Sequence, residues 1–299
     1  MKIYQILLLD IKKKIEPNTL PEHLTSLTFG HRFNQKIEPN TLPKNLTTLI
    51  FGYKFNKKIK PGTLPKKLTT LTFGDKFNQK IKPGTLPKKL TTLNFGDDFN
   101  QKIEPNTLSK NITTLIFEDN FNQKIEPNTL PKNLTTLIFG YNFNQKIEPG
   151  TLPENLRNLI FGYHFNQKIG PNTLPENLRT LTFKYHFNQK IDSKMLPFNL
   201  KNIIFDWMYI DNYDPLKHQI GMIDNIPSYY HVKIFIKKDI FGINGPKYPI
   251  HVVYCKEHEW SPDIYDIRDK YRHSNYGNIT ILINKKTYQP YSSAKSALK

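Results

Sequence analysis

The chain has 299 residues and carries 43 Lys and Arg against 25 Asp and Glu, a formal net charge of +18. This balance favours anionic partners but does not bear on the fold. The single cysteine, Cys255, excludes an internal disulfide and favours a reducing compartment. Asp10 follows the apolar N-terminal run without a small-residue cleavage site, and no apolar stretch approaches the ~20 residues that span a bilayer. We therefore expect a cytoplasmic protein with neither a secretory leader nor a membrane span.

Residues 1–10 are expected to supply a first strand. Ile3, Ile6 and Leu8 follow, with a shift of one residue, the spacing L-x-x-L-x-L that recurs further along the chain. Terminal units of a repeat array are atypical because they cover an open face. We interpret this segment as an N-terminal cap strand.

From residue 11 to 208 the chain repeats itself every 22 residues. A copy without the Phe-Asn pair begins at Ile11. The pair itself returns without insertion or deletion at Phe33, Phe55, Phe77, Phe99, Phe121, Phe143, Phe165 and Phe187. A fixed period of 20–50 residues is typical of a solenoid, in which each repeat forms one coil that stacks on its neighbours. We predict an array of nine repeats and, with the cap, about ten coils.

Each repeat is interpreted as one short strand, a corner and an irregular return. Leu49 and Phe51 should point inward while Thr48 and Ile50 alternate outward, as in a strand. Two prolines in nearly every repeat exclude a regular helix on the return side. The apolar side chains expected inside one coil are Leu46, Leu49, Phe51, Phe55, Ile59 and Leu64. A lone coil buries too little apolar surface to offset the entropy of ordering it, so the coils must stack.

Three repeated positions predict features of the backbone. The residue after the first proline is always Asn or Gly, which indicates a left-handed turn: Asn18, Asn40, Gly62, Gly84, Asn106, Asn128, Gly150 and Asn172. The Gly that follows the strand is replaced by Glu118 and Lys184, so that turn does not require positive φ. The Asn after each Phe, such as Asn100, predicts a ladder of amides that satisfies backbone groups of adjacent coils, with a ligand-binding row as the alternative.

The motif FNQKIEPNTLPKNLTTLIFG resembles the FNIP repeat, a 22-residue variant of the leucine-rich repeat found in social amoebae and in giant viruses of amoebae. The resemblance covers residues 11–208 and holds through eight consecutive registers. It implies a leucine-rich-repeat-like solenoid, mainly β with an irregular convex side, that serves as an interaction module. For a viral chain the expected compartment would be that of an infected host cell.

The period is lost beyond Tyr209. Alternating segments predict strands within 226–236, 250–255 and 278–284, so we expect 209–288 to form a β-rich cap or small domain and 289–299 a loose basic tail. Candidate chemistry in this part is limited to His251, Cys255 and His258, with Glu257 and Glu259 nearby. They lack a fourth zinc ligand and an oxyanion device, so a structural role is favoured. We predict no catalytic residue, no metal and no cofactor.

The outward strand positions predict a partner-binding face, which is the usual binding surface of a solenoid. The candidates are Thr48, Thr70, Thr92, Thr114 and Thr136, joined in the last three copies by Arg157, Arg179 and Lys201. A flat Thr ladder could instead bind a regular lattice such as ice. The mixture of Ile50 and Asn94 in the third outward column favours simple strand propensity.

A second candidate surface is rich in lysine. Every repeat carries a Lys before the inward Ile, and Glu two residues later compensates it in most copies but not at Lys60 or Lys82. A polyanion patch is therefore predicted at Lys54, Lys57, Lys58, Lys60, Lys66, Lys67, Lys80, Lys82, Lys88 and Lys89. A solvated lysine face is the alternative, since Arg and exposed aromatic residues are scarce there.

These observations favour a monomeric, non-enzymatic scaffold that binds another protein. The alternative is a binder of nucleic acid or another polyanion through residues 54–89.

Overall fold

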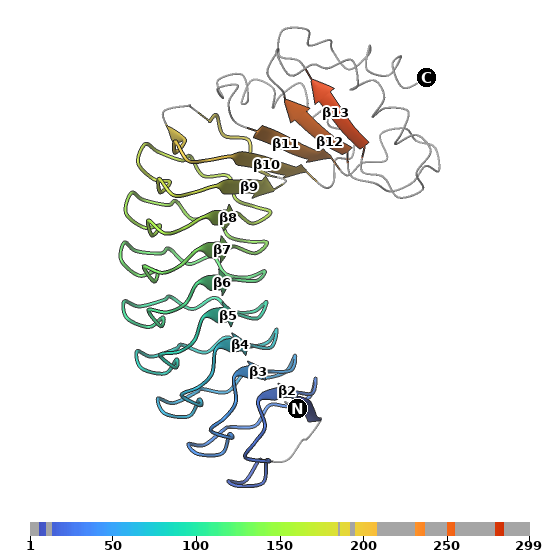
Figure 1. Cartoon of the computed structure of the whole chain (residues 1–299), viewed down its shortest axis with the longest axis vertical. Helices are drawn as coiled ribbons and strands as arrows, with labels where there is room; N and C mark the ends of the chain where they lie inside the picture. The colour runs from blue at the N-terminus through green and yellow to red at the C-terminus, as the bar shows by residue number, and fades with distance from the viewer. Residues whose placement is uncertain are drawn as a thin grey trace.

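The computed structural model describes residues 6–9, 14–184, 186–191, 195–207, 231–236, 250–254 and 279–283, and side chains only between 14 and 204. The described strands form one sheet and follow one another in chain order (Figure 1). They are β1 (Ile6–Leu9), β2 (Ser26–Phe29), β3 (Thr48–Ile50), β4 (Thr70–Thr72), β5 (Thr92–Asn94), β6 (Thr114–Ile116), β7 (Thr136–Ile138), β8 (Asn158–Ile160), β9 (Thr180–Lys184), β10 (Asn202–Trp207), β11 (His231–Ile236), β12 (Ile250–Tyr254) and β13 (Ile279–Ile283).

Coils stack because identical positions of successive repeats lie side by side. Strands β2 to β10 are parallel, and Thr48, Leu49 and Ile50 of β3 face the residues 22 positions later in β4. Strands β3 to β7 therefore present the same alternation, with the central Leu buried and the flanking residues partly exposed. Figure 1 shows that the stack bends, with β2–β9 along the inner side of the curve. The predicted solenoid is confirmed.

The first strand lies where the sequence predicts it, but its register differs by one residue. Strand β1 pairs in parallel with β2, and Leu7 and Leu9 stand beside Leu27 and Phe29. The prediction that Ile6 and Leu8 occupy these positions is therefore wrong. Four consecutive apolar residues offer no alternation that could fix the register, so the pairing with β2 decides it.

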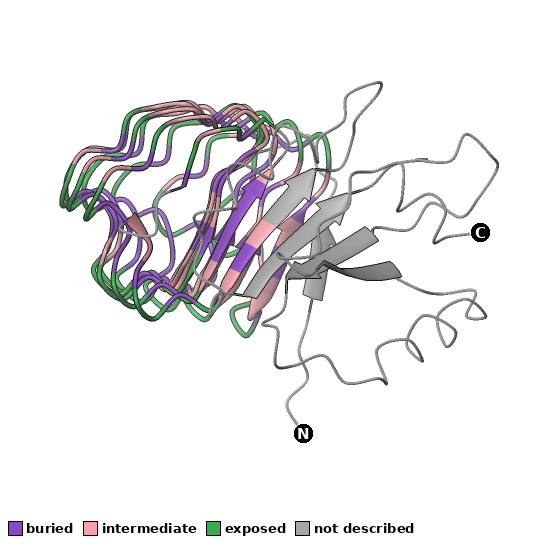
Figure 2. Cartoon of the chain, turned by 90° about the horizontal axis from the view of Figure 1, so that it is seen from above, coloured by how far each residue is buried: buried purple, intermediate pink, exposed green. Residues whose placement is uncertain are grey.

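All six apolar positions predicted to lie inside the coil are buried in each repeat whose side chains are described over residues 33–187. Figure 2 shows the buried positions lining the coil interior and the exposed ones at its outer corners. Phe51 stacks on Phe55 of the same coil at 3.8 Å between ring centroids, and on Phe73 of the next coil at 5.8 Å. The two Phe columns thus form a continuous aromatic ribbon along the array.

A tight turn precedes each of the strands β2–β8, and a second one follows it. Before β3 the Leu46 N–H donates to the Pro43 carbonyl at 3.2 Å, and after it the Phe55 N–H donates to the Gly52 carbonyl at 3.0 Å. The predicted left-handed position on the return side is confirmed in every copy, with φ from 57 to 64° for Asn and from 76 to 82° for Gly. The position is restricted to Asn and Gly because a β-branched or bulky side chain would be strained in the left-handed conformation.

The position after the strand is Gly in most copies for a different reason. None of the described copies adopts positive φ, which agrees with the sequence prediction. A Cβ on Gly74 would lie 1.9 Å from the carbonyl oxygen of Gly52, so the column is glycine because successive backbones nearly touch at this corner. The copy with Glu118 keeps the same turn: the Phe121 N–H lies 3.4 Å from the Glu118 carbonyl, within the 2.9–3.5 Å found in the copies with Gly.

The three strands predicted beyond residue 209 are present. Strand β11 continues the parallel stack on β10, β12 is antiparallel to β11, and β13 is parallel to β12. Of the candidate chemistry in this part, His251 falls within β12, whereas Cys255, Glu257, His258, Glu259 and the tail 289–299 lie outside the described residues. Over the described parts of the chain, no helix is long and apolar enough to cross a membrane.

Candidate partner-binding face

The outward side chains of the strands form one register row on the inner side of the curve. Thr48 aligns with Thr70, and the row continues through β5, β6 and β7 to Asn158 of β8. All five predicted Thr residues stand in this row and are partly exposed. The floor of the face is therefore neutral and polar at constant spacing.

The column immediately before this row serves the stack itself. The Thr69 hydroxyl donates to the Thr47 carbonyl of the preceding coil at 3.0 Å, and the same bond recurs at Thr91, Thr113 and Thr135. Arg157 and Arg179 interrupt this series, although their backbone N–H groups still bond to the preceding coil at 2.9 and 2.8 Å. Their side chains and that of Lys201 are exposed. The structure thus groups these three cations at the β8–β10 end of the face.

Charged residues occupy the two turns that enclose the strands. The central positions of the turns before β3–β7 carry the lysine rim: Lys44, Lys66, Lys67, Lys88, Lys89, Lys110 and Lys132. The turns after β4–β6 carry the acidic rim: Asp75, Asp97, Asp98, Glu118 and Asp119. The extended stretch from Leu46 to Gly52 joins the two turns of a coil, and at ~3.3 Å per residue it separates the rims by ~20 Å.

The lysines of the rim are all exposed to solvent. Lysines of adjacent coils stand roughly 4.8 Å apart, the spacing of neighbouring strands. No acidic residue occupies these turn positions between Lys44 and Lys132. Lys67 is anchored by donating from Nζ to the Asn45 Oδ1 of the preceding coil at 2.7 Å. The rim is therefore a row of like charges that the turns themselves do not neutralise.

The acidic rim shows mutual repulsion. Partial burial raises the pKa of Asp97, and the neighbouring charges of Asp75, Asp119, Glu118 and Asp98 raise it further. Lys76 offsets one of these charges, since its Nζ lies 2.9 Å from the Asp98 carboxylate. This hydrogen bond and the attraction of Asp98 raise the pKa of Lys76. The remaining carboxylates keep a net negative charge at this end of the strands.

The residues of the predicted polyanion patch fall into separate columns. Lys54 lies in the turn after the strand, whereas Lys66, Lys67, Lys88 and Lys89 lie in the turn before it. The rest lie on the return side of the coil, at Lys57, Lys58, Lys60, Lys80 and Lys82. Lys44, Lys110 and Lys132 complete the lysine rim but lie outside 54–89. Aligning the repeats and reading down the turn column could have found them.

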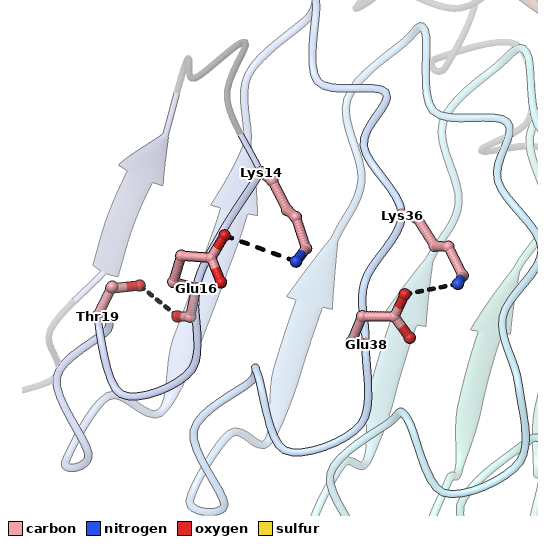
Figure 3. A network of polar contacts seen from close by, with 5 residues as sticks. All are labelled: Lys14, Glu16, Thr19, Lys36 and Glu38. Atoms are coloured by element: carbon pink, nitrogen blue, oxygen red, sulfur yellow. Dashed lines mark hydrogen bonds and ion pairs between the residues drawn. The ribbon is translucent and has the colours of Figure 1, made fainter.

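The return side pairs many of its charges within one coil. Lys14 lies 3.6 Å from Glu16, and Lys36 lies 2.5 Å from Glu38. Figure 3 shows both pairs side by side on the return side. The hydrogen bond from Lys36 lowers the pKa of Glu38, and the charges of nearby lysines act in the same direction. Such exposed pairs contribute little to stability. Where Lys82 replaces the acid, Lys80 reaches Glu104 of the next coil instead, at 3.2 Å.

The predicted amide ladder is present. The Oδ1 of Asn56 accepts hydrogen bonds from the backbone N–H of Asn78 at 3.1 Å and from the Gln79 side chain at 2.8 Å. The same pair of hydrogen bonds recurs along the array. An open groove of about 630 Å³ runs alongside the ladder. It is lined by Asn56, Asn78, Asn100, Asn122, Lys76, Asp98, Asn120 and Asn142. The ladder therefore holds adjacent coils together, while one side of it faces solvent.

The turns after the strands carry aromatic rings towards the C-terminal end of the array. Tyr141 stacks on Tyr163 with ring centroids 4.6 Å apart, and His164 stacks on His186 at 4.7 Å. Partial burial lowers the pKa of His186, and the neighbouring His164 lowers it further. Within the described ranges, no group of three or more His, Cys, Asp or Glu is placed to hold a metal ion.

Comparison with known proteins agrees with this architecture. The profile of the family described as FNIP Repeat matches residues 12–54, 55–98, 99–142, 143–186 and 165–207. Among solved structures, the chain is similar to CroV588, a giant-virus protein described as a novel circular LRR protein, with 33% identity and a TM-score of 0.62. The match covers 92% of this chain but 42% of CroV588, so the chain spans less than half of that protein. No curated protein matches the sequence.

Proposed function

Because the chain belongs to the FNIP repeat family, we propose that it is a non-enzymatic scaffold that binds a protein on its strand face. The observation that carries this proposal is the unbroken register row from Thr48 to Asn158 on the inner side of the curve. A rigid row of partly exposed side chains can contact a partner with little loss of conformational freedom. The leucine-rich-repeat-like fold supports this role.

Several of the other repeated columns hold the coils together, whereas the face and its rims are not needed for stacking. Thr69 bonds to the preceding coil, Asn56 holds the amide ladder, and the Leu and Phe columns fill the interior. Arg157 and Arg179 depart from the stacking pattern at the expense of a hydroxyl bond to the preceding coil. These two arginines, with Lys201, are therefore candidate contacts at the C-terminal end of the face.

The lysine rim favours a second candidate function, the binding of nucleic acid or another polyanion. Binding through rim lysines would weaken steeply with salt, because each neutralised phosphate releases a counterion. Fluorescence anisotropy with single-stranded and double-stranded DNA at low and at physiological salt tests this function. A steep loss of affinity supports it, and no binding at low salt contradicts it.

We place the protein in a reducing, cytoplasmic compartment, which for a viral chain is that of an infected host cell. The single Cys255 supports this placement. Mass spectrometry of the protein isolated from its native cells tests it, and Cys255 held in an intermolecular disulfide would contradict it.

Site-specific photo-crosslinking tests the face as the binding surface. A photoreactive residue at Thr92 should capture a discrete protein partner in extracts of the native cells. The same probe at Lys102, an exposed position on the return side, is the matched control. Adducts of equal yield and identity at both positions would contradict the proposal.

A further inference from the structure

We propose that the strand face is electrically polarised across β4–β6 and binds a protein segment with acidic residues at one end and basic residues at the other. The segment lies along the strands, with its acidic end at the lysine rim and its basic end at the acidic rim. This inference rests on the proposed function and specifies the kind of partner.

The two rims overlap in the same coils. Over β4–β6 the turns before the strands carry Lys66, Lys67, Lys88, Lys89 and Lys110. The turns after the same strands carry the acidic rim, in which Lys76 is already engaged by Asp98 at 2.9 Å and lies 5.4 Å above the Tyr53 ring. One end of these strands is therefore cationic and the other anionic, and the charges reverse over the length of a single strand.

The rims do not cancel each other in solution. They are separated by ~20 Å, whereas the Debye length at physiological salt is about 8 Å. A partner approaching the face therefore meets two local fields of opposite sign. In the turns after β4–β6 five carboxylates share one cation, Lys76, so the carboxylates repel one another. A basic side chain from a partner would relieve this repulsion.

The floor between the rims is free of charge. Thr70, Thr92 and Thr114 form its central row, and Thr72, Asn94 and Ile116 form the row beside it. These side chains are partly exposed and can form hydrogen bonds or van der Waals contacts with a neutral segment. An extended segment of about six residues spans ~20 Å. Such a segment reaches both rims in only one orientation.

Uniform polyanions and polycations fit this surface less well. A strand of nucleic acid that crosses the face would bring phosphates against the acidic rim, and like charges in juxtaposition disfavour a wrong partner. A uniformly basic peptide meets the same difficulty at the lysine rim. The arrangement therefore selects for the order of charges along the partner and not for its net charge.

The test uses synthetic peptides and the full chain. The probe carries three Glu, a neutral spacer of about five Gly, Ser and Thr residues, and three Lys, so that its charged ends can reach both rims. A peptide of the same composition with Glu and Lys alternating is the first control, and all-Glu and all-Lys peptides are the others. By fluorescence anisotropy the two-ended peptide should bind about tenfold more tightly than the alternating one.

Charge reversal on the protein provides the decisive variants. A triple charge reversal in the lysine rim makes both rims net acidic and should abolish the preference for the two-ended peptide: Lys66→Glu, Lys88→Glu and Lys110→Glu. Adding Asp75→Lys, Asp97→Lys and Asp119→Lys exchanges the sign of the two rims at the original net charge, and the preference should return because the peptide can bind in the reverse direction. Lys58→Glu, Lys60→Glu and Lys82→Glu, on the return side, make the same change of charge as the first triple variant and should leave the preference intact. Circular dichroism melting verifies that each variant is folded.

Three outcomes would overturn the inference. They are equal binding of the two-ended and alternating peptides, failure of the six-residue exchange to restore the preference in a folded variant, and tightest binding of the all-Glu peptide. Crosslinking of a partner at Thr92 combined with any of these outcomes would leave the proposed function standing while removing the polarised mode. Absence of both crosslinking and peptide preference would remove the two together.

Discussion

Inside the coils nearly every column keeps one residue type from end to end, whereas the turns that flank the strands change from coil to coil. The inner Phe and Leu positions repeat almost without exception along the array. The central pair of the turn after the strand is Tyr53-Lys54 in one coil, Asp97-Asp98 in another and Tyr163-His164 in a third. This contrast divides the molecule into a stacking interior and a variable pair of rims.

The difference follows from how a solenoid is held together. An interior side chain contacts copies of itself above and below, so a change in one coil disturbs two interfaces. A turn side chain is more exposed and contacts its neighbours through single ion pairs, hydrogen bonds or ring stacks, so a change there disturbs less of the stack. We therefore infer that stability resides in the interior columns and that the turns beside the strand face select its partner.

The largest effect is expected from a Phe of the aromatic ribbon. Phe99 is buried and stacks 3.9 Å from Phe95 and 6.1 Å from both Phe77 and Phe121. Phe99→Ala should lower the free energy of unfolding by about 3–5 kcal/mol, as measured by chemical denaturation. Phe198, which is 85% exposed in a turn, offers the same substitution as a control and should cost almost nothing. Equal losses of unfolding free energy at Phe99 and Phe198 would contradict the division into a stabilising interior and tolerant turns.

A smaller effect is expected at the corner where backbones nearly touch. Gly74→Ala places a Cβ 1.9 Å from the Gly52 carbonyl oxygen and should cost about 1–3 kcal/mol, because the stack must open locally. Gly170→Ala is the matched control, since its Cβ would lie 3.5 Å from the Thr173 hydroxyl and its φ is not positive. It should be neutral or slightly stabilising. A Gly74 variant as stable as the parent would show that the corner is not closely packed.

The smallest effect concerns charge on the acidic rim. The pKa of Asp97 is raised in the folded protein, so the ionised carboxylate destabilises the fold at pH values above that pKa. This destabilisation disappears below the pKa of Asp in the unfolded chain, near ~3.9, because the carboxyl is then protonated in both states. Asp97→Asn should therefore raise the free energy of unfolding at pH 7 by no more than about 0.5 kcal/mol, seen as a slightly higher melting temperature. Near pH 3 the melting temperature should not change. A lower melting temperature at pH 7 would mean that Asp97 has a stabilising partner.

Sequence alone predicted what a single repeat determines. The period, the inward apolar positions, the left-handed Asn and Gly residues and the amide ladder all follow from residue type and spacing within one unit, and the structure confirms them. The terminal strand could not be aligned, because Ile6–Leu9 is apolar at every position and only its neighbour sets the register.

Features that belong to the stack and not to the repeat escaped prediction. The Gly74 column is fixed by the carbonyl of the preceding coil, which no single repeat contains. The lysine rim joins residues 22 positions apart, so a search along residues 54–89 combined turn lysines with return-side lysines and omitted Lys44, Lys110 and Lys132. The acidic rim is dispersed in the sequence for the same reason.

The division between interior and turns is tested most directly by chemical denaturation of two variants in adjacent parts of the array. Asn100 accepts from the Asn122 backbone N–H and from the Gln123 side chain, both at 3.0 Å, whereas Lys88 is an exposed turn residue. Asn100→Leu should lower the free energy of unfolding by about 1–3 kcal/mol, because donors of the next coil lose their acceptor. Lys88→Glu should change it by no more than about 0.5 kcal/mol. A Lys88 variant that loses as much stability as the Asn100 variant, or an Asn100 variant that loses none, would contradict the account.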